Sequence, residues 1–340
     1  MQTWQQELRD AVSSPRDPEL SGYAFARTGG LVIEKFRLLV PRPYLRLIDP
    51  ENPNDPIARM AFASPEELVT TPDALRDPIG DLDRQVAPRL THRYRDRALL
   101  HVTNLCPMYC RFCFRKNLMN EREEELYSGG FEGAFAYLAA HPEIEELILT
   151  GGDPWMLSDE KLSALVNEIA ARVPSLRRLR FHTRMPVTLP SRVQAGLLGA
   201  IVRPDRFRTF VVTHFNHPRE LGRGAREALR VLTRGGVTVL NQSVLLKGVN
   251  DSAALLRELF LALGNEGVLP YYLHHCDLVA GAEHFRTSFA EGRRVWTELR
   301  GTLPGYLLPE YVVETPGGFG KVPVGGNFTL PFAGEQGLRG

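Results

Sequence analysis

From Ala98 onward, extended stretches alternate with helical ones, and this alternation restricts the chain to a parallel α/β fold. Extended segments are expected at 98–103, 147–150, 177–183, 208–215, 237–245, 270–275 and 305–314. Helical segments are expected near 131–140, 159–172, 191–201, 218–233, 252–264 and 289–300. Strands that alternate with helices form βαβ units and pair in parallel. Six such units and a last extended segment predict a partial or complete barrel in preference to an open, doubly wound sheet.

The regions on either side of this pattern predict three parts. Residues 1–97 are expected to form a mainly helical N-terminal extension, residues 98–304 the barrel, and residues 305–340 a short C-terminal segment. A helix is expected from about residue 4 to residue 12. Ser64 and Glu67 have the spacing of a capping box, in which each side chain bonds the other residue's backbone N–H.

Composition excludes several classes of protein. The 340 residues carry 41 basic and 40 acidic side chains, so no net charge attracts nucleic acid or an anionic membrane. No apolar run reaches the ~18 residues that a membrane span needs. The N-terminus MQTWQQELRD has no signal-peptide pattern. Four cysteines, three of them clustered, do not suggest a disulfide framework, and a cytoplasmic location is expected.

Unusual polar clusters follow almost every expected strand. In chain order they are CPMYCRFC (106–113), GGDP (151–154), HTR (182–184), THFNH (213–217), Asn241 with Gln242, Cys276 with Asp277, and GGFGK (317–321). Each alone could be a turn or a buried polar group. In barrels of parallel strands the catalytic groups gather at the carboxyl ends of the strands. The repetition therefore predicts one active site at that end of the barrel.

The first cluster holds Cys106, Cys110 and Cys113, with the spacing CxxxCxxC. A zinc site would need a fourth ligand, which His101 or His92 could supply. A 4Fe–4S cluster held by three cysteines instead leaves one iron without a protein ligand. That open iron could bind a molecule that must react there.

CxxxCxxC, with an aromatic Phe112 before the last cysteine, resembles the radical S-adenosylmethionine (SAM) superfamily. The resemblance implies a 4Fe–4S cluster on Cys106, Cys110 and Cys113, with SAM bound to the open iron. It also implies that the glycine motif at Gly151, Gly152 and Asp153 receives the SAM amino group. The expected fold becomes a partial (β/α)6-type radical SAM barrel.

Lys321 follows three glycines in PGGFGKVP. The segment could be a flexible loop with a solvated amine. It could also carry a Schiff-base lysine whose backbone approaches a flat cofactor closely. Arg93, Tyr94 and Arg97 precede the first barrel strand, and arginine forks suit a phosphate dianion, although both arginines could be surface charges.

From about 90 to 327 the chain resembles the lysine 2,3-aminomutase family. The stretches that carry the resemblance are HRYRDRALL, CPMYCRFCFRK, LTGGDPWMLSD, HTRMPVTLPSR, THFNHPRE, LNQSVLLKGVND, YYLHHCDLVAGAEHFRT and PGGFGKVPV. The resemblance implies pyridoxal 5′-phosphate (PLP) bound covalently to Lys321. The other implied roles are a phosphate site at Arg93, Tyr94 and Arg97, SAM contacts from His214 and Gln242, a substrate-carboxylate site at Arg115, and a site for the distal substrate ammonium at Asp277 and Glu314.

The activity implied by this resemblance is conversion of L-lysine to β-lysine by migration of the amino group, started by hydrogen abstraction from the β-carbon. The family's lysine enzymes usually have aspartate at the second acidic position, so Glu314 leaves arginine or ornithine open as substrates. The short tail resembles the branch that supplies (R)-β-lysine for elongation factor P. A non-catalytic iron–sulfur electron carrier is the alternative from a different class.

The resemblance also implies partners. An electron donor such as flavodoxin or ferredoxin is expected, as is a small amino acid substrate, and a homodimer is possible. The longer members of the family carry late cysteines for an interface metal. This chain has no cysteine after Cys276 and has Ser252 at a position where those enzymes have cysteine, so no interface zinc is expected.

Overall fold

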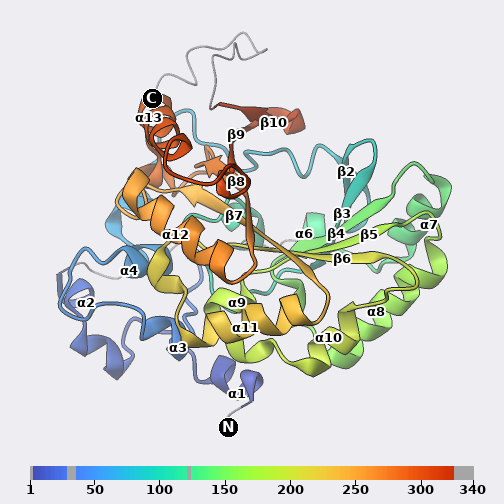
Figure 1. The fold of residues 1–340 in the computed structure, drawn as a ribbon, viewed down its shortest axis with the longest axis horizontal. Helices are drawn as coiled ribbons and strands as arrows, with labels where there is room; N and C mark the ends of the chain where they lie inside the picture. Colours follow the sequence, from blue (N-terminus) through green and yellow to red (C-terminus); the bar gives the residue numbers. More distant parts are fainter. Residues whose placement is uncertain (1–2, 29–35, 121–123, 325–340) are drawn as a thin grey trace.

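One ten-stranded sheet organises the computed structural model, which describes residues 3–28, 36–120 and 124–324. The strands pair with their sequence neighbours in unbroken order from β1 to β10 (Figure 1). They are β1 (Gln85–Ala87), β2 (Leu90–Tyr94), β3 (Arg97–Thr103), β4 (Glu146–Gly151), β5 (Arg178–His182), β6 (Arg208–Thr213), β7 (Thr238–Leu245), β8 (Leu269–His275), β9 (Glu310–Thr315) and β10 (Gly320–Pro323).

The central strands are parallel and the outer ones are antiparallel. Strands β3 to β9 pair in parallel, whereas β1 and β2 at one edge and β10 at the other pair antiparallel. In the described part of the chain no pairing joins β1 to β10. The sheet is therefore an open barrel, and the predicted partial α/β barrel is confirmed.

The parallel strands present different side chains to their two faces. In β5 the apolar Leu179 and Phe181 are fully buried, whereas Arg180 and His182 alternate with them and face a pocket. The same alternation places Leu147 and Leu149 of β4 in the core and Ile148 on the pocket side. Because side chains alternate along a strand, one face of the sheet packs against helices and the other is free to build a site.

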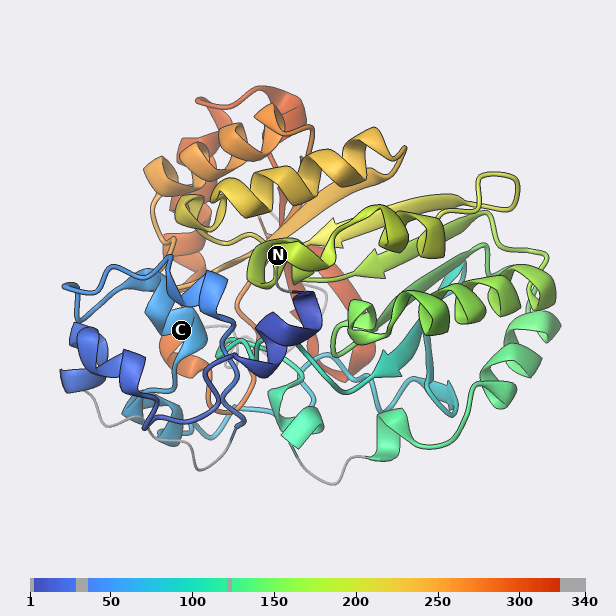
Figure 2. The same cartoon turned by 90° about the horizontal axis from the view of Figure 1, so that it is seen from below.

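Helices connect the parallel strands and cover the outer face of the sheet (Figure 2). Their apolar residues recur at helical spacing, as in Leu162, Leu165, Val166 and Ile169 of α8, which places one stripe in the core. From the cysteine loop onward the α-helices are α5 (Lys116–Asn120), α6 (Glu124–Tyr127), α7 (Glu132–Ala140), α8 (Asp159–Arg172), α9 (Met185–Thr188), α10 (Ala195–Ile201), α11 (Arg223–Arg234), α12 (Ala253–Asn265) and α13 (Phe289–Arg300). Short 3-10 turns are η3 (Pro154–Met156), η4 (Pro190–Arg192), η5 (Pro218–Glu220), η6 (Glu283–Phe285), η7 (Gly305–Leu307) and η8 (Pro316–Gly318).

The N-terminal segment consists of short helices that precede the β1–β2 hairpin. They are α1 (Trp4–Arg9), η1 (Pro18–Gly22), α2 (Ala24–Thr28), α3 (Arg42–Leu45), α4 (Pro56–Ala61) and η2 (Pro65–Leu68). The predicted capping box at Ser64 is wrong, because the Ser64 side chain makes no cap hydrogen bond. Glu67 is instead buried and accepts hydrogen bonds from Arg111 (2.7 Å) and Lys116 (3.0 Å). It thereby fastens the N-terminal segment to the cysteine loop.

The sheet crosses both predicted part boundaries. The β1–β2 hairpin lies before residue 98 and pairs with β3, and β9 and β10 lie after residue 304 and continue the sheet. The three predicted parts, 1–97, 98–304 and 305–340, remain predictions, and the last includes residues 325–340, which lie outside the described ones.

Candidate active site

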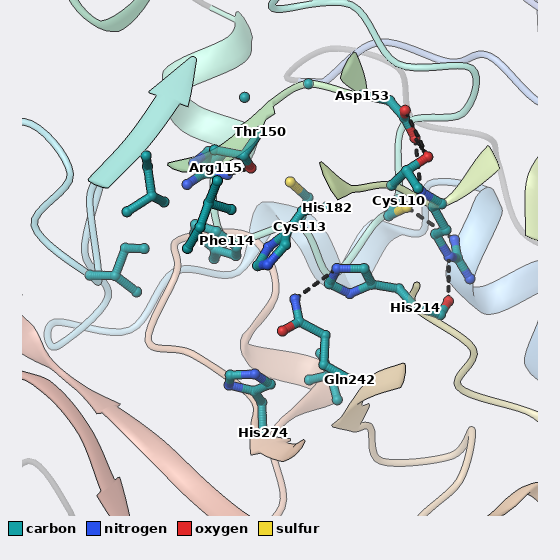
Figure 3. Close-up of a pocket in the computed structure, with 18 of the residues that line it drawn as sticks. Cys110, Cys113, Phe114, Arg115, Thr150, Asp153, His182, His214, Gln242 and His274 are labelled. Carbon is teal, nitrogen blue, oxygen red and sulfur yellow. Dashed lines mark hydrogen bonds between the residues drawn. The ribbon is translucent and has the colours of Figure 1, made fainter. Parts of the chain in front are cut away.

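A pocket opens on the inner face of the sheet, at the carboxyl ends of the parallel strands (Figure 3). It brings together every site residue predicted from the sequence. These residues are Arg93, Tyr94, Arg97, Cys106, Cys110, Cys113, Arg115, Gly151, Gly152, Asp153, His214, Gln242, Asp277, Glu314 and Lys321. Strands β2, β3, β4, β7, β9 and β10 contribute some of these residues. The loops after β3, β4, β6 and β8 contribute the others.

The three clustered cysteines are free thiols that line one part of this pocket. Burial raises the pKa of Cys113 to about 11, and burial also raises the pKa of Cys106. Such thiols stay protonated unless a metal replaces their protons. Three soft sulfur donors on one loop fit an iron–sulfur cluster, in which each thiolate binds a different iron atom. Within the described ranges no three His, Cys, Asp or Glu side chains gather as ligands of one metal ion.

The two histidines considered as a fourth zinc ligand form hydrogen bonds with other side chains. His101 Nε2 lies 2.9 Å from the Thr91 hydroxyl, and His92 Nδ1 lies 2.9 Å from the Tyr137 hydroxyl. Neither histidine lines the pocket that contains the cysteines. The geometry therefore does not support a zinc site completed by either of them.

The glycine motif after β4 packs directly on the cysteine loop. The Gly152 N–H donates to the Thr103 carbonyl (2.6 Å), and the Asp153 N–H donates to the Leu105 carbonyl (2.8 Å). A Cβ at Gly152 would lie 2.3 Å from the Leu105 carbonyl oxygen. Only glycine allows this approach, which fixes the distance between the motif and Cys106.

Asp153 ties this motif to the next strand. Its carboxylate accepts hydrogen bonds from the Thr183 hydroxyl (2.8 Å) and from the backbone N–H of Arg184 (2.8 Å) and Trp155 (3.0 Å). Burial raises the pKa of Asp153 to about 6, although these donors act in the opposite direction. Asp153 thus holds together the loops that follow β4 and β5.

Gly152→Ala is expected to reduce the free energy of unfolding by about 1–3 kcal/mol, because the new methyl group must displace the Leu105 backbone. Chemical denaturation of the apoprotein measures the change. Gly199→Ala in α10 is the matched control, since a Cβ there meets nothing within 4 Å and alanine favours a helix. Equal stability of the Gly152→Ala protein and the wild type would contradict the close approach.

His214 and Gln242 form a polar pair on the sheet side of the pocket. The Gln242 Nε2 lies 2.7 Å from His214 Nε2 (Figure 3). Burial lowers the pKa of His214 to about 3, so its imidazole is neutral at physiological pH. A neutral imidazole accepts the amide N–H and fixes the amide oxygen toward a ligand.

Lys321 lines the same pocket from the edge strand β10. Its backbone N–H donates to the Tyr94 hydroxyl (3.0 Å), and a Cβ at Gly320 would lie 2.7 Å from that same hydroxyl oxygen. The Lys321 ammonium pairs with Glu314 and lies 5.7 Å from the centre of the Tyr272 ring. A primary amine beside an aromatic wall, with Arg93 and Arg97 lining the same pocket, fits a flat aldehyde cofactor that carries a phosphate.

The two predicted phosphate arginines have different surroundings. Arg93 is buried and bonds the Ile79 carbonyl (2.6 Å) and Glu314 (3.1 Å). Arg97 is partly exposed and stacks on Tyr94, with its guanidinium carbon 3.9 Å from the ring centre. Arg97 is therefore the more accessible of the two cations.

Asp277 and Glu314 line the pocket near Lys321. Burial raises the pKa of Asp277 to about 7, and the negative charge of Glu314 adds to this effect. Glu314 pairs with both Lys321 and Arg93. A cationic ligand group would relieve the repulsion between the two acids.

Arg115 lies between the cysteines and the sheet. It donates to Asp81 (2.7 Å) and to the Thr150 hydroxyl (3.0 Å), and it is 5% exposed. Asp81 is fully buried and its pKa is lowered, because Arg115 and neighbouring cations more than offset the effect of burial. The Arg115 guanidinium is thus held in a fixed orientation at the pocket wall.

Comparison with known proteins places the chain in a family. The model of the 4Fe–4S single cluster domain matches residues 96–196, which include all three clustered cysteines. The L-lysine 2,3-aminomutase of Escherichia coli strain K12 is 38% identical over 325 residues, which cover 94% of each chain. The chain belongs to the lysine 2,3-aminomutase family. Proteins of the same name are 37% identical in Clostridium subterminale, over 88% of this chain and 71% of the relative, and 36% identical in Haemophilus influenzae, over 93% and 94%.

Members of this aminomutase family are radical SAM isomerases, and the chain is an isomerase with an iron–sulfur domain. Its described helices include none that is long and apolar enough to cross a membrane.

Several residues of the aminomutase pocket were not predicted from the sequence. They are His182, Arg184 and His274, which line the pocket, and Asp81, which lies behind its wall and bonds Arg115. His182 and His274 occupy inward-facing positions of β5 and β8, and their Nε2 atoms are buried without a hydrogen-bond partner among the described residues. Two sequence features indicate three of these four residues. They are the HTR motif at 182–184 and the pair of histidines at 274–275.

Proposed function

We propose that this aminomutase converts L-lysine to β-lysine and uses a 4Fe–4S cluster, SAM and PLP in the single pocket described above. The observation that carries the proposal is that three thiols, a glycine motif, a primary amine and two carboxylates line one pocket. Three relatives with 36–38% identity bear the name L-lysine 2,3-aminomutase.

Cys106, Cys110 and Cys113 would hold the cluster, and the Gly151–Asp153 segment, His214 and Gln242 would bind SAM beside it. When bound, the cluster and SAM supply a carbon radical that can abstract a hydrogen atom. The close packing of Gly152 on Leu105 would fix such a SAM site relative to the cysteine loop. Such fixed placement of reacting groups is a large part of catalysis.

Lys321 would carry PLP, with Arg93, Tyr94 and Arg97 near its phosphate. When bound, PLP supplies a π-system that holds the migrating amino group. Arg115 would orient the substrate carboxylate, because its fork is already aligned by Asp81 and Thr150. A carboxylate pair at Asp277 and Glu314 suits a substrate whose far end is an ammonium and disfavours an acidic side chain.

The proposal is tested by anaerobic incubation of the reconstituted protein with lysine, ornithine and arginine separately. We expect lysine to react best and to give a product of unchanged mass with the amino group on the β-carbon. Chiral analysis then separates (R)-β-lysine, the form used on elongation factor P, from its mirror image. A higher kcat/KM for ornithine or arginine would replace the lysine assignment, whereas SAM cleavage without any amino acid product would remove the aminomutase function.

The acidic pair predicts a pH dependence. With a pKa of about 7, Asp277 is charged above pH 7 and neutral below it, so attraction of a substrate ammonium is lost as the pH falls through 7. We expect kcat/KM for lysine to fall about tenfold per pH unit below this value. Asp277→Asn should lower kcat/KM by about two to three and a half orders of magnitude, as expected for ~3–5 kcal/mol, and remove this acidic limb.

Rates measured from pH 5.5 to 8.5 test the assignment, with binding of SAM as the control that should not change. If kcat/KM of the Asp277→Asn protein falls below pH 7 as steeply as that of the wild type, another group causes the pH dependence.

A further inference from the structure

Arg184 follows β5, and its charged side chain donates a hydrogen bond to one of the three clustered cysteines, Cys110. Its Nη1 lies 3.0 Å from the Cys110 sulfur. Its Nε donates to the His214 carbonyl (3.1 Å), and its Nη2 donates to Glu220 and to the Tyr44 hydroxyl (3.3 Å). All three guanidinium nitrogens of Arg184 therefore donate hydrogen bonds, and the residue is 8% exposed.

The partners of Arg184 are themselves fixed. Glu220 is fully buried, and it accepts hydrogen bonds from the Tyr44 hydroxyl (2.7 Å) and from the backbone N–H of Asn216 (2.6 Å) and His217 (3.1 Å). The backbone N–H of Arg184 donates to Asp153 (2.8 Å). These contacts come from four separate segments, so the Arg184 fork has one orientation, with Nη1 directed at sulfur.

The Arg184 guanidinium is also enclosed by aromatic rings. Its central carbon lies 5.3 Å from the centre of the Phe112 ring and 5.5 Å from that of Tyr44. Together with the low exposure of Arg184, this packing shields most of the guanidinium from water. In such surroundings a charge-assisted hydrogen bond is stronger than in water.

A hydrogen bond to a ligand sulfur changes the reduction potential of an iron–sulfur cluster. Reduction adds one negative charge to the cluster. A nearby positive charge and an N–H donor stabilise the reduced form more than the oxidised form, because the interaction grows with the negative charge on sulfur. Their removal should make the cluster harder to reduce.

We propose that Arg184 is a positioning residue that raises the reduction potential of the iron–sulfur cluster through its hydrogen bond to Cys110, with Glu220 and Tyr44 holding the guanidinium in place. The inference rests on the proposed assignment of the cluster to Cys106, Cys110 and Cys113. The proposal gives the arginine of the HTR motif a function. Packing alone does not explain this residue, because packing would not require its guanidinium to contact a cysteine.

Arg192 provides a matched comparison. It is 1% exposed and belongs to the same segment of the chain, and it donates to the carbonyls of Trp155 (2.9 Å) and Leu157 (3.0 Å). It does not line the pocket that contains the cysteines. A variant of Arg192 therefore reports the general cost of losing a buried arginine without the contact to sulfur.

The test is a redox titration of the anaerobically reconstituted protein, followed by the electron paramagnetic resonance signal of the reduced cluster. The wild type is compared with Arg184→Met, Arg184→Lys and Arg192→Met. At the midpoint of the wild type, we expect the ratio of reduced to oxidised cluster in Arg184→Met to be about tenfold lower, which is 59 mV for a one-electron couple. Arg184→Lys should shift in the same direction by less, because lysine keeps the charge but not the fork, and Arg192→Met should not shift.

The outcomes separate the inference from the proposed function. If Arg184→Met has its full iron content and its cluster has the same midpoint potential as the wild-type cluster, the proposed role of Arg184 is overturned. The assignment of the cluster to the three cysteines is then unaffected. If Arg184→Met does not retain its cluster, the Arg184→Lys midpoint decides, and no shift there overturns the inference. Loss of the cluster from both variants, while Arg192→Met retains it, would show that Arg184 is needed for assembly and would also overturn a tuning role. A wild-type protein without any cluster would reject the proposed function itself.

Discussion

Cys110→Ala is expected to prevent assembly of a complete 4Fe–4S cluster and to abolish reductive cleavage of SAM. The cysteine loop has three thiols, and the histidines nearest in sequence are bonded elsewhere, so no neighbouring soft ligand can replace the lost one. Iron and sulfide content, the electron paramagnetic resonance signal after dithionite reduction, and deoxyadenosine formation measure the effect. We expect loss of SAM cleavage to the background rate.

Cys276→Ser is the control for this experiment. Cys276 is 1% exposed, burial raises the pKa of its thiol to about 12, and it does not line the pocket. The Cys276→Ser protein should keep its cluster and its SAM cleavage. Full cluster content and normal deoxyadenosine formation in Cys110→Ala would refute the ligand assignment.

Lys321→Ala is expected to remove the covalent PLP adduct and to stop amino migration, while the cluster remains. The Lys321 amine lies against Tyr272 and Glu314 in the pocket, and Lys321 belongs to β10, whereas the three cysteines follow β3. Borohydride reduction followed by peptide mass analysis should locate the adduct on Lys321 in the wild type and find none in the variant. Iron content should be equal in the two proteins.

Two other lysines serve as comparisons. Lys116 is buried in a contact with Glu67 and the Gly281 carbonyl, and Lys247 lies outside the residues that line the pocket. Lys247→Ala should therefore retain the adduct. A reduced adduct on Lys116 or Lys247 of the wild-type protein would disprove the assignment to Lys321.

The sequence predicted the regular part of the fold well, because its strands and helices have strong periodicity. The predicted helices 159–172 and 289–300 coincide with α8 and α13. The strands β1, β2 and β10 were missed, since they have only 3, 5 and 4 residues. Strands this short carry little local signal of their own.

The location of the site could also be predicted, because functional residues of a parallel barrel lie at strand ends. The contacts among these residues could not. Asp81 lies 34 positions before Arg115 in the chain, so this pair exists only once the N-terminal segment has packed on the barrel. Glu220 lies 36 positions after Arg184, so this pair exists only once β5 and β6 lie side by side. Glu67 shows the converse case, where a local capping pattern was overridden by Arg111 and Lys116.

The most direct measurement of the central claim uses lysine that carries deuterium on its β-carbon. The reconstituted wild-type protein is incubated anaerobically with this lysine, SAM, PLP and a reductant, and SAM and the amino acids are recovered. The account predicts β-lysine as product and deuterium in the recovered SAM, because hydrogen leaves the β-carbon and returns through the deoxyadenosyl group. β-Lysine formed at an undiminished rate without SAM, or SAM consumed while lysine and its deuterium remain unchanged, would contradict the account.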